Sequence, residues 1–355
     1  MTNQSLGYNE GLENYRIERK LDSFEIGRVI SEHKERYTVK TSSNEFDSEL
    51  IGNLRFTAEN RYDFPAVGDW VAFSEYDENK ALIHSVYPRT SILERQAVGK
   101  KGQVQIIATN IDFGLIVQAV NRDFNLNRLE RYLTICNSSK IEPIIVLSKI
   151  DLLHESELED IINQIKSRIK GLQIITVSNQ IEDGYNGINQ IIQKGKTYCL
   201  LGSSGVGKST LLNNLSGKSL MEIGQISESV NKGRHITSHR ELVVLENGGI
   251  LIDNPGMREV GISDLSQGLE TTFETIVGIS KNCKFKDCSH IHEKGCAILE
   301  AVNNGKVDPD ALLNFQKIER ERSHFESSIT DRRKKDKDFG KMIKGIQKER
   351  RKNKY

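Results

Sequence analysis

The chain has 355 residues, of which 37% are hydrophobic, and its formal net charge is +1. These values exclude a chain that is disordered throughout, because such chains combine low hydrophobicity with high net charge. The length predicts two to three domains. No apolar run approaches the roughly 18 residues needed to span a bilayer, and the amino terminus lacks the hydrophobic segment of a secretory signal. We therefore expect a cytoplasmic protein.

Residues 1–24 are polar, carry little apolar periodicity and predict an extension before the first domain. Residues 25–96 contain short runs in which β-branched and aromatic residues alternate with polar ones. Several short strands in one segment predict a small barrel, for which an OB-fold is the first interpretation. A small β-sandwich and an SH3-like barrel are the alternatives. The runs are RYTVKT, NLRFTA, DWVAFSEY and ALIHSVY.

Residues 102–280 have a different residue pattern. Their apolar runs are so uniformly hydrophobic that strands formed by them would have no solvent-exposed face. Helix-like stretches such as NLNRLERYLTICNSS lie between several of them. Buried strands that alternate with helices predict a mostly parallel sheet covered on both faces, which makes this an α/β domain. The apolar runs are VQIIATN, FGLIVQAV, EPIIVLS, LQIITVS, KTYCLLG and GGILIDN.

Two loops in this domain have the residue types that recognise guanine. Ser148-Lys149-Ile150-Asp151 follows an apolar run, at the carboxyl end of a strand, where α/β sheets bind ligands. Asp151 can accept hydrogen bonds from the ring N–H and exocyclic amine of guanine while the Lys149 stem covers the ring. Ser178 and Asn179 end the next run, where a backbone N–H can reach the guanine carbonyl oxygen. When the first loop is considered by itself, a solvated surface turn is the alternative to guanine recognition.

A phosphate-binding loop follows, because residues 202–209 match G-x-x-x-x-G-K-[ST] between a predicted strand and a predicted helix. The glycines let backbone N–H groups surround phosphate oxygens at a helix N-terminus. Lys208 would reach the β- and γ-phosphates and Ser209 would bind Mg²⁺. A Gly/Ser-rich surface turn is the alternative. The predicted phosphate-binding residues are Gly202, Ser203, Ser204, Gly205, Val206, Gly207, Lys208, Ser209 and Thr210.

The order of these loops is unusual. Asp253 ends the run GILI and Gly256 follows it, where the Mg²⁺-facing aspartate and the γ-phosphate-binding glycine of a GTPase belong. In an ordinary GTPase the phosphate loop precedes the guanine loop, whereas here Asp151 precedes Gly202. The sequence therefore predicts a circular permutation, which is tolerable because domain termini are often close together at the surface.

Residues 281–331 hold a cysteine cluster followed by a helix for which Asp308 is the predicted N-cap. The spacing C-x₄-C-x-H-x₅-C supplies three thiolates and an imidazole, a closed tetrahedral set suited to one structural Zn²⁺. Either His290 or His292 can provide the imidazole, and reduced free cysteines are the alternative. The predicted thiolate ligands are Cys283, Cys288 and Cys296.

Residues 332–355 form a basic tail with 12 basic and 3 acidic residues, so its net charge of +9 leaves −8 for the rest. A basic tail on an acidic body predicts a polyanionic partner, such as the phosphates of RNA. The alternative is a solvated tail that only improves solubility.

Together these features resemble the ribosome small-subunit-dependent GTPase A family of circularly permuted bacterial GTPases. The matching segments are VGDWV (Val67–Val71), DFNLNRLERYL (Asp123–Leu133), the permuted loops, GRHITS (Gly233–Ser238), DNPG and the cysteine cluster. The resemblance implies an OB domain, a permuted GTPase domain and a zinc domain. It also implies a protein that binds the 30S subunit late in assembly and whose GTPase activity the subunit stimulates.

The resemblance also implies roles for single residues. Thr237 matches the threonine expected at Mg²⁺ and the γ-phosphate, His235 matches a histidine with a catalytic role, and His290 matches the zinc-binding histidine. Met257 occupies the position after the switch glycine where many GTPases have a water-orienting glutamine, so we expect slow intrinsic turnover. Ser148 stands where Asn or Thr is usual, which predicts a lost or shortened bracing contact.

Three other functions fit parts of the sequence. One is another P-loop enzyme, such as an ATPase or a nucleotide kinase. A second is an RNA-binding module that uses nucleotide only as a structural ligand. The third is a zinc-dependent DNA regulator, although no helix-turn-helix pattern accompanies the cluster. We predict a GTP hydrolase that acts as a monomer on the small ribosomal subunit and its rRNA, with Mg²⁺ accompanying GTP or GDP.

Overall fold

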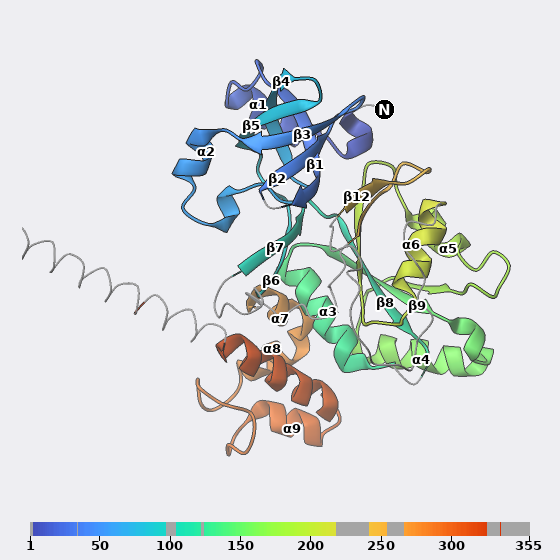
Figure 1. Ribbon diagram of the computed structural model, residues 1–355. Coiled ribbons are helices and arrows are strands. Elements are labelled where there is room, and N and C mark those ends of the chain that lie inside the picture. The colour runs from blue at the N-terminus through green and yellow to red at the C-terminus, as the bar shows by residue number, and fades with distance from the viewer. Residues whose placement is uncertain are drawn as a thin grey trace, which may run out of the picture.

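The computed structural model describes residues 3–33, 35–96, 104–121, 124–217, 241–253 and 266–324, together with residue 334. Figure 1 shows a barrel at the amino-terminal end, an α/β unit beside it and a helical part formed by the last described residues. No helix within these ranges has the length and hydrophobicity needed to span a membrane.

The amino-terminal strands close into the predicted OB-like barrel. Their order is β1-β2-β3-β5-β4, and β4 pairs back onto β1; only the β3–β5 pairing is parallel. Val29, Phe46, Phe73 and Ile83 meet in the barrel core. The strands are β1 (Glu25–His33), β2 (Arg36–Lys40), β3 (Glu45–Leu50), β4 (Trp70–Asp77) and β5 (Lys80–Val86).

The run NLRFTA was wrongly expected to be a strand. It lies in helix α2 (Gly52–Thr57), which a 3₁₀ turn, η2 (Arg61–Asp63), follows before β4. Because β3 is already paired with β2 on one side and β5 on the other, the barrel has no edge for another strand there. Phe56 of this helix is 91% exposed.

The first described residues, which we expected to form a polar extension, are folded onto the barrel. They form a 3₁₀ turn, η1 (Asn3–Leu6), and helix α1 (Glu10–Glu18), which cover one side of the barrel. Leu6 and Leu12 are buried against Trp70 and its neighbours. These apolar residues are few and widely spaced in the sequence, so their shared burial could not be recognised from periodicity.

The α/β unit has the expected parallel core, in the order β10-β9-β8-β11-β13, with β12 antiparallel at its end. Helices α3 and α4 share one core with one face of the sheet, and α5 and α6 share another core with the other face. The elements are β8 (Phe113–Ala119), α3 (Leu126–Ser138), β9 (Glu142–Ser148), α4 (Glu155–Arg168), β10 (Ile174–Val177), α5 (Asn186–Ile191), β11 (Thr197–Leu201), α6 (Lys208–Ser216), β12 (Glu241–Val244) and β13 (Ile250–Asp253).

One apolar run, VQIIATN, does not belong to this sheet. It forms β7 (Val104–Thr109), which pairs antiparallel with β6 (Ile92–Gln96) in a separate two-stranded ribbon. Ile107 and Ala108 are buried in the core that also contains α3 residues. The uniform hydrophobicity of this run therefore reflects burial beneath helices rather than a place in the parallel sheet.

A buried polar cluster joins the barrel to the ribbon. The side chain of Arg28 is 1% exposed and donates to the carbonyl oxygens of Leu6 (2.7 Å), Gly68 (3.1 Å) and Asn110 (3.1 Å). Burial lowers the pKa of Arg28 to about 10, which still leaves the guanidinium charged at neutral pH. One cation thus satisfies carbonyl groups from three segments of the chain.

Asp69, in the VGDWV segment, holds the same region together. Its carboxylate is fully buried, pairs with Arg89 at 2.6 and 2.8 Å and accepts the Thr109 hydroxyl at 2.6 Å. Gly68 has a φ of +97°, and a Cβ there would lie 2.2 Å from the Thr109 carbonyl oxygen. The segment is therefore fixed by packing and by charge at the point where the barrel meets β7.

The helical part begins with α7 (Ser266–Thr272), which packs against α3, and continues with α8 (Glu274–Ser280) and α9 (Ala297–Asn303). A last described helix spans residues 309–324. The predicted N-cap is confirmed, because Asp308 Oδ1 accepts the Asp310 N–H at 2.8 Å. Phe315 of this helix packs edge-on against Phe273, with 5.5 Å between ring centroids.

Candidate nucleotide-binding site and metal centre

The phosphate loop connects β11 to α6, as the sequence predicts. Gly202, Gly205 and Gly207 have φ values of +145°, +80° and +96°, a region that side chains disfavour. A Cβ on Gly202 would lie 2.3 Å from the Val117 carbonyl oxygen. Val206 is buried under the loop in the core shared with α6. Glycine at the turning points and one buried anchor thus fix the curved backbone that phosphate binding needs.

The side chains of the loop lie at the start of α6. Lys208 Nζ donates to the Gly202 carbonyl oxygen at 2.7 Å and to that of Ser203. Ser209 and Thr210 follow in the first turn of the helix and are partly buried, whereas Ser204 is exposed at the tip of the loop. The ammonium group of Lys208 therefore points back across the loop, where phosphate oxygens would be bound.

The guanine loop is attached to the phosphate loop by two side chains. Ser148 Oγ donates to the Val206 carbonyl oxygen at 2.6 Å, and Lys149 Nζ donates to the Gly205 carbonyl oxygen at 2.7 Å. Lys149 has a φ of +60°, which turns the chain sharply after β9. The bracing contact that the serine was expected to lose or shorten is therefore made by its hydroxyl.

Asp151 and the second guanine loop meet beside these braces. Ser178 is 2% exposed; its Oγ donates to Asp151 Oδ1 and accepts the Gln180 N–H at 3.0 Å. A cavity of about 220 Å³ opens here, and the residues of both guanine loops line it together with residues of α6. The lining residues are Ser148, Lys149, Asp151, Leu152, Val177, Ser178, Asn179, Gln180, Tyr185, Gly207, Thr210 and Leu211. Ile150 is partly buried and packs against the core on the α3 side.

Five lining residues were not among the predicted site residues: Leu152, Val177, Gln180, Tyr185 and Leu211. Burial and the nearby charge of Asp151 raise the pKa of Tyr185, so its phenol is neutral at physiological pH. Leu152 is 57% exposed although it is apolar. A lone aromatic residue before a short helix and a leucine after Asp151 carry no distinctive sequence signal, which explains why both were missed.

The residues predicted to face Mg²⁺ are only partly described. The backbone of Asp253 lies at the carboxyl end of β13, next to β11, which leads into the phosphate loop. His235, Thr237 and Gly256 lie outside the described residues.

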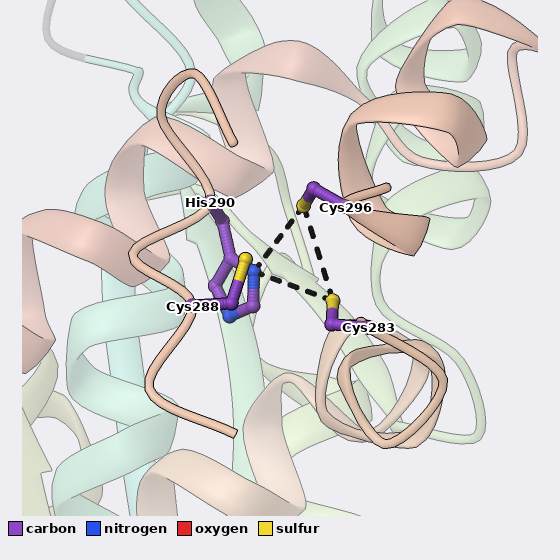
Figure 2. A group of neighbouring side chains, drawn as sticks. All are labelled: Cys283, Cys288, His290 and Cys296. Carbon is purple, nitrogen blue, oxygen red and sulfur yellow. Dashed lines mark hydrogen bonds between the residues drawn. The ribbon is translucent and has the colours of Figure 1, made fainter. Parts of the chain in front are cut away.

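The cysteine cluster forms a compact donor set in the helical part (Figure 2). The ligand atoms of Cys283, Cys288, His290 and Cys296 all lie within 4.8 Å of one another. His290 Nδ1 is 3.4 Å from Cys296 Sγ and 3.7 Å from Cys283 Sγ, and these two sulfurs are 3.9 Å apart. Tetrahedral Zn²⁺ with sulfur and nitrogen ligands requires edges of about 3.5 to 3.8 Å. The donor set fits zinc, and His290 rather than His292 belongs to it.

Glu293 orders the loop that carries His290, a role that the sequence did not reveal. Its carboxylate accepts the N–H groups of Ser289 (2.7 Å), Ile291 (3.0 Å) and His292 (3.1 Å). These hydrogen bonds and that of the Ser289 hydroxyl hold the pKa of Glu293 far below its usual range. Gln316, on the last described helix, donates to the His290 carbonyl oxygen at 2.8 Å and fixes the loop from the other side.

Comparison with known proteins identifies the chain. The family model described as RsgA GTPase matches residues 86–263. A small ribosomal subunit biogenesis GTPase RsgA 2 of Lactiplantibacillus plantarum is 41% identical over 301 residues, 84% of each chain. An RsgA 1 of Bacteroides thetaiotaomicron is 38% identical over 91% of this chain and 90% of that protein.

This chain belongs to the RsgA GTPase family. It is therefore a GTP hydrolase. The fold agrees with those of two solved structures. YjeQ from Thermotoga maritima has a TM-score of 0.61 at 23% identity, over 84% of this chain and 98% of that one. YloQ, described as a circularly permuted GTPase, has a TM-score of 0.59 at 25% identity, over 87% and 96%. The permuted loop order of this RsgA chain is thus confirmed.

Proposed function

We propose that this RsgA protein binds the small (30S) ribosomal subunit through its rRNA, assists late maturation of the subunit, and hydrolyses GTP faster when bound to it. The printed names of its relatives support a role in small-subunit biogenesis. One observation carries the proposal: in this member of the family, hydrogen bonds join the guanine loop to the phosphate loop beside a single cavity. We further propose that it acts as a monomer in the cytoplasm.

In this proposal Asp151 binds the guanine edge, and backbone groups at Ser178 and Asn179 meet its carbonyl oxygen. The loop from Gly202 to Thr210 binds the phosphates, with Lys208 at the β- and γ-phosphates. Ser209 binds Mg²⁺ and Asp253 faces it. Thr237, which the resemblance implies, is the third residue at the ion. The assignment of the guanine-binding residues is supported by geometry, because Asp151, Asn179 and Thr210 line one cavity. ATP would offer Asp151 no matching donor pair.

For the hydrolytic step we propose that His235 positions the attacking water and that Gly256 donates its N–H to the γ-phosphate. Met257 has no hydrogen-bonding group for water, so slow turnover without the subunit follows from the residue type.

We propose that the donor set of Cys283, Cys288, His290 and Cys296 holds one structural Zn²⁺. With four protein ligands no coordination position is left for water, so the ion would stabilise the helical part rather than take part in hydrolysis. The sulfur and nitrogen separations support this assignment.

The deciding experiment is phosphate release from GTP, with and without purified small ribosomal subunits, with Lys208→Ala as the blank. Strong stimulation that is absent from the blank supports both the chemistry and the partner. GTP binding without stimulation would favour the alternative of an RNA-binding module that uses nucleotide as a structural ligand.

A further inference from the structure

A second cavity, of about 360 Å³, lies where the start of α3 meets the last described helix. None of its lining residues lines the base cavity. It contains three cations, three carboxamides and one leucine, and no carboxylate is among its lining residues. The lining residues are Asn125, Asn127, Arg128, Arg131, Leu313, Asn314 and Lys317.

Two acidic side chains next to this cavity, Glu130 and Glu321, are already paired. Glu130 receives two hydrogen bonds from Arg168, at 2.6 and 2.9 Å, and a third from the Asn314 amide at 2.6 Å. Glu321 pairs with Arg131 at 2.6 Å. These contacts offset the charges of Glu130 and Glu321, so the charged groups of the lining itself are all cationic.

Arg128 and Lys317 supply that potential. Within the described part of the chain, neither side chain has an ion pair with a carboxylate. Arg128 is partly buried on α3, whereas Lys317 is exposed on the facing helix. These two cations face one cavity from two helices, and neither is paired with a carboxylate of the described residues. Such an arrangement is typical of a site that binds an anion between the helices.

The rest of the cavity is chemically mixed. Asn314 is 6% exposed, and its amide also donates to the Asn127 carbonyl oxygen at 3.1 Å, which ties the two helices together. Leu313 is 59% exposed at the rim. Cations for phosphate, amides for sugar or base edges and an apolar contact for a base are the groups that bind an RNA strand.

We propose that this cavity, defined by Arg128, Lys317 and Asn314, binds the phosphodiester backbone of an RNA strand, with Leu313 against an adjacent base or ribose. The proposal rests on the proposed function and deepens it, since it places an RNA contact where the α/β unit meets the helical part. A small free anion is the competing occupant, and the experiment distinguishes the two.

The test measures the affinity of the full chain for a fluorescent single-stranded RNA, oligouridine, across a range of salt concentrations. A parallel titration uses purified small ribosomal subunits. The double variant Arg128→Gln/Lys317→Gln removes the two cations. Lys170→Gln/Lys194→Gln removes two exposed cations elsewhere and is the matched control. GDP affinity, which should equal that of the wild type in both, shows that the variants are folded.

Each phosphate contact adds about 0.7 to the slope of log affinity against log salt for a single strand. We therefore expect the slope on oligouridine to fall by about 1.4 in the cavity variant and to stay unchanged in the control. Equal slopes for the cavity variant and the wild type overturn the proposal, as does an equal fall in both variants. If 10 mM inorganic phosphate protects Arg128 from phenylglyoxal but oligouridine does not, the site binds a small anion and the proposal is also overturned.

The subunit titration separates this inference from the proposed function. If the wild-type chain does not bind small subunits, the proposed function fails, while the oligouridine slopes still decide the cavity. If the wild type binds subunits and the cavity variant binds them with the same salt slope, the cavity is not used there and the inference fails alone.

Discussion

The hydroxyl of Ser148 donates to the Val206 carbonyl oxygen at 2.6 Å, so the loop proposed to bind the base is attached to the loop proposed to bind phosphate. Both residues are buried. Ser148→Ala removes the donor and leaves the carbonyl unsatisfied, which costs about 1 kcal/mol or more. We expect GDP and GTP to bind about fivefold more weakly to this variant, as measured with a fluorescent GDP analogue.

Ser148→Asn is the informative companion variant, because asparagine is common at this position in guanine loops and retains a donor. Its nucleotide affinity should equal that of the wild type or exceed it. If the alanine variant binds GDP as well as the wild type does, the contact does not contribute to nucleotide binding.

Asp151→Asn tests the base assignment. The amide nitrogen donates where the carboxylate accepted, so it opposes the donors of guanine and matches the carbonyl group of xanthine. We expect GTP binding to fall by at least tenfold while xanthosine triphosphate binding rises. The competing triphosphates are compared by displacement of labelled GDP. An unchanged preference for GTP, or a preference for ATP, would remove Asp151 from base recognition.

His235→Ala tests the proposed water-positioning residue. The variant should lose at least tenfold in subunit-stimulated phosphate release, because general-base or positioning groups typically contribute that much or more. Its affinity for GDP should remain near that of the wild type. Stimulated turnover equal to that of the wild type would exclude a role of His235 in hydrolysis.

The candidate metal centre allows two neighbouring histidines to be compared. His290 Nδ1 lies among the three cysteine sulfurs, whereas His292, two residues later, is exposed and outside the set. His290→Ala should lose most of its zinc and unfold at a lower temperature, while His292→Ala should retain about one zinc ion per chain. Metal content and thermal unfolding are measured on the same samples. Equal zinc content in both variants would contradict the assignment.

Asp69 provides a test of stability. Asp69→Asn removes the negative charge that faces Arg89, whose side chain is only 8% exposed, and leaves a buried cation unpaired. Breaking a buried pair in this way costs about 3 to 5 kcal/mol of unfolding free energy. Asp77 pairs with Lys80 at 2.7 Å on the surface, so Asp77→Asn is the control and should leave stability unchanged. Urea unfolding compares the two; equal losses would show that burial is not the cause.

Most residues of the candidate nucleotide-binding site and metal centre could be predicted from local sequence, because they lie close together in the chain. The phosphate loop and the spacing of the cysteines could be read directly, since each is a single short segment. The ligand choice between His290 and His292 could not be settled from spacing, because both lie within reach of the cysteines. It depends on the loop that Glu293 orders through three backbone N–H groups.

The contacts that sequence could not predict are those between distant segments. The Ser148–Val206 and Lys149–Gly205 hydrogen bonds span 58 and 56 residues, and no local pattern encodes them. NLRFTA and VQIIATN were misread for a related reason. Both have strand-like composition, but whether such a run becomes a helix, a ribbon or a sheet strand depends on which sheet edges are still unpaired.

Strand β1 of the barrel pairs with strand β12, which lies at the end of the α/β sheet. Ser31 of β1 pairs with Glu241 at the start of β12, so the last strand of the α/β sheet meets the barrel instead of ending in solvent. An uncovered edge strand offers its N–H and C=O groups to other chains and promotes aggregation. The barrel thus covers the start of this edge, at Glu241. An α/β unit cut free of its barrel should self-associate through β12, even if its nucleotide pocket is intact.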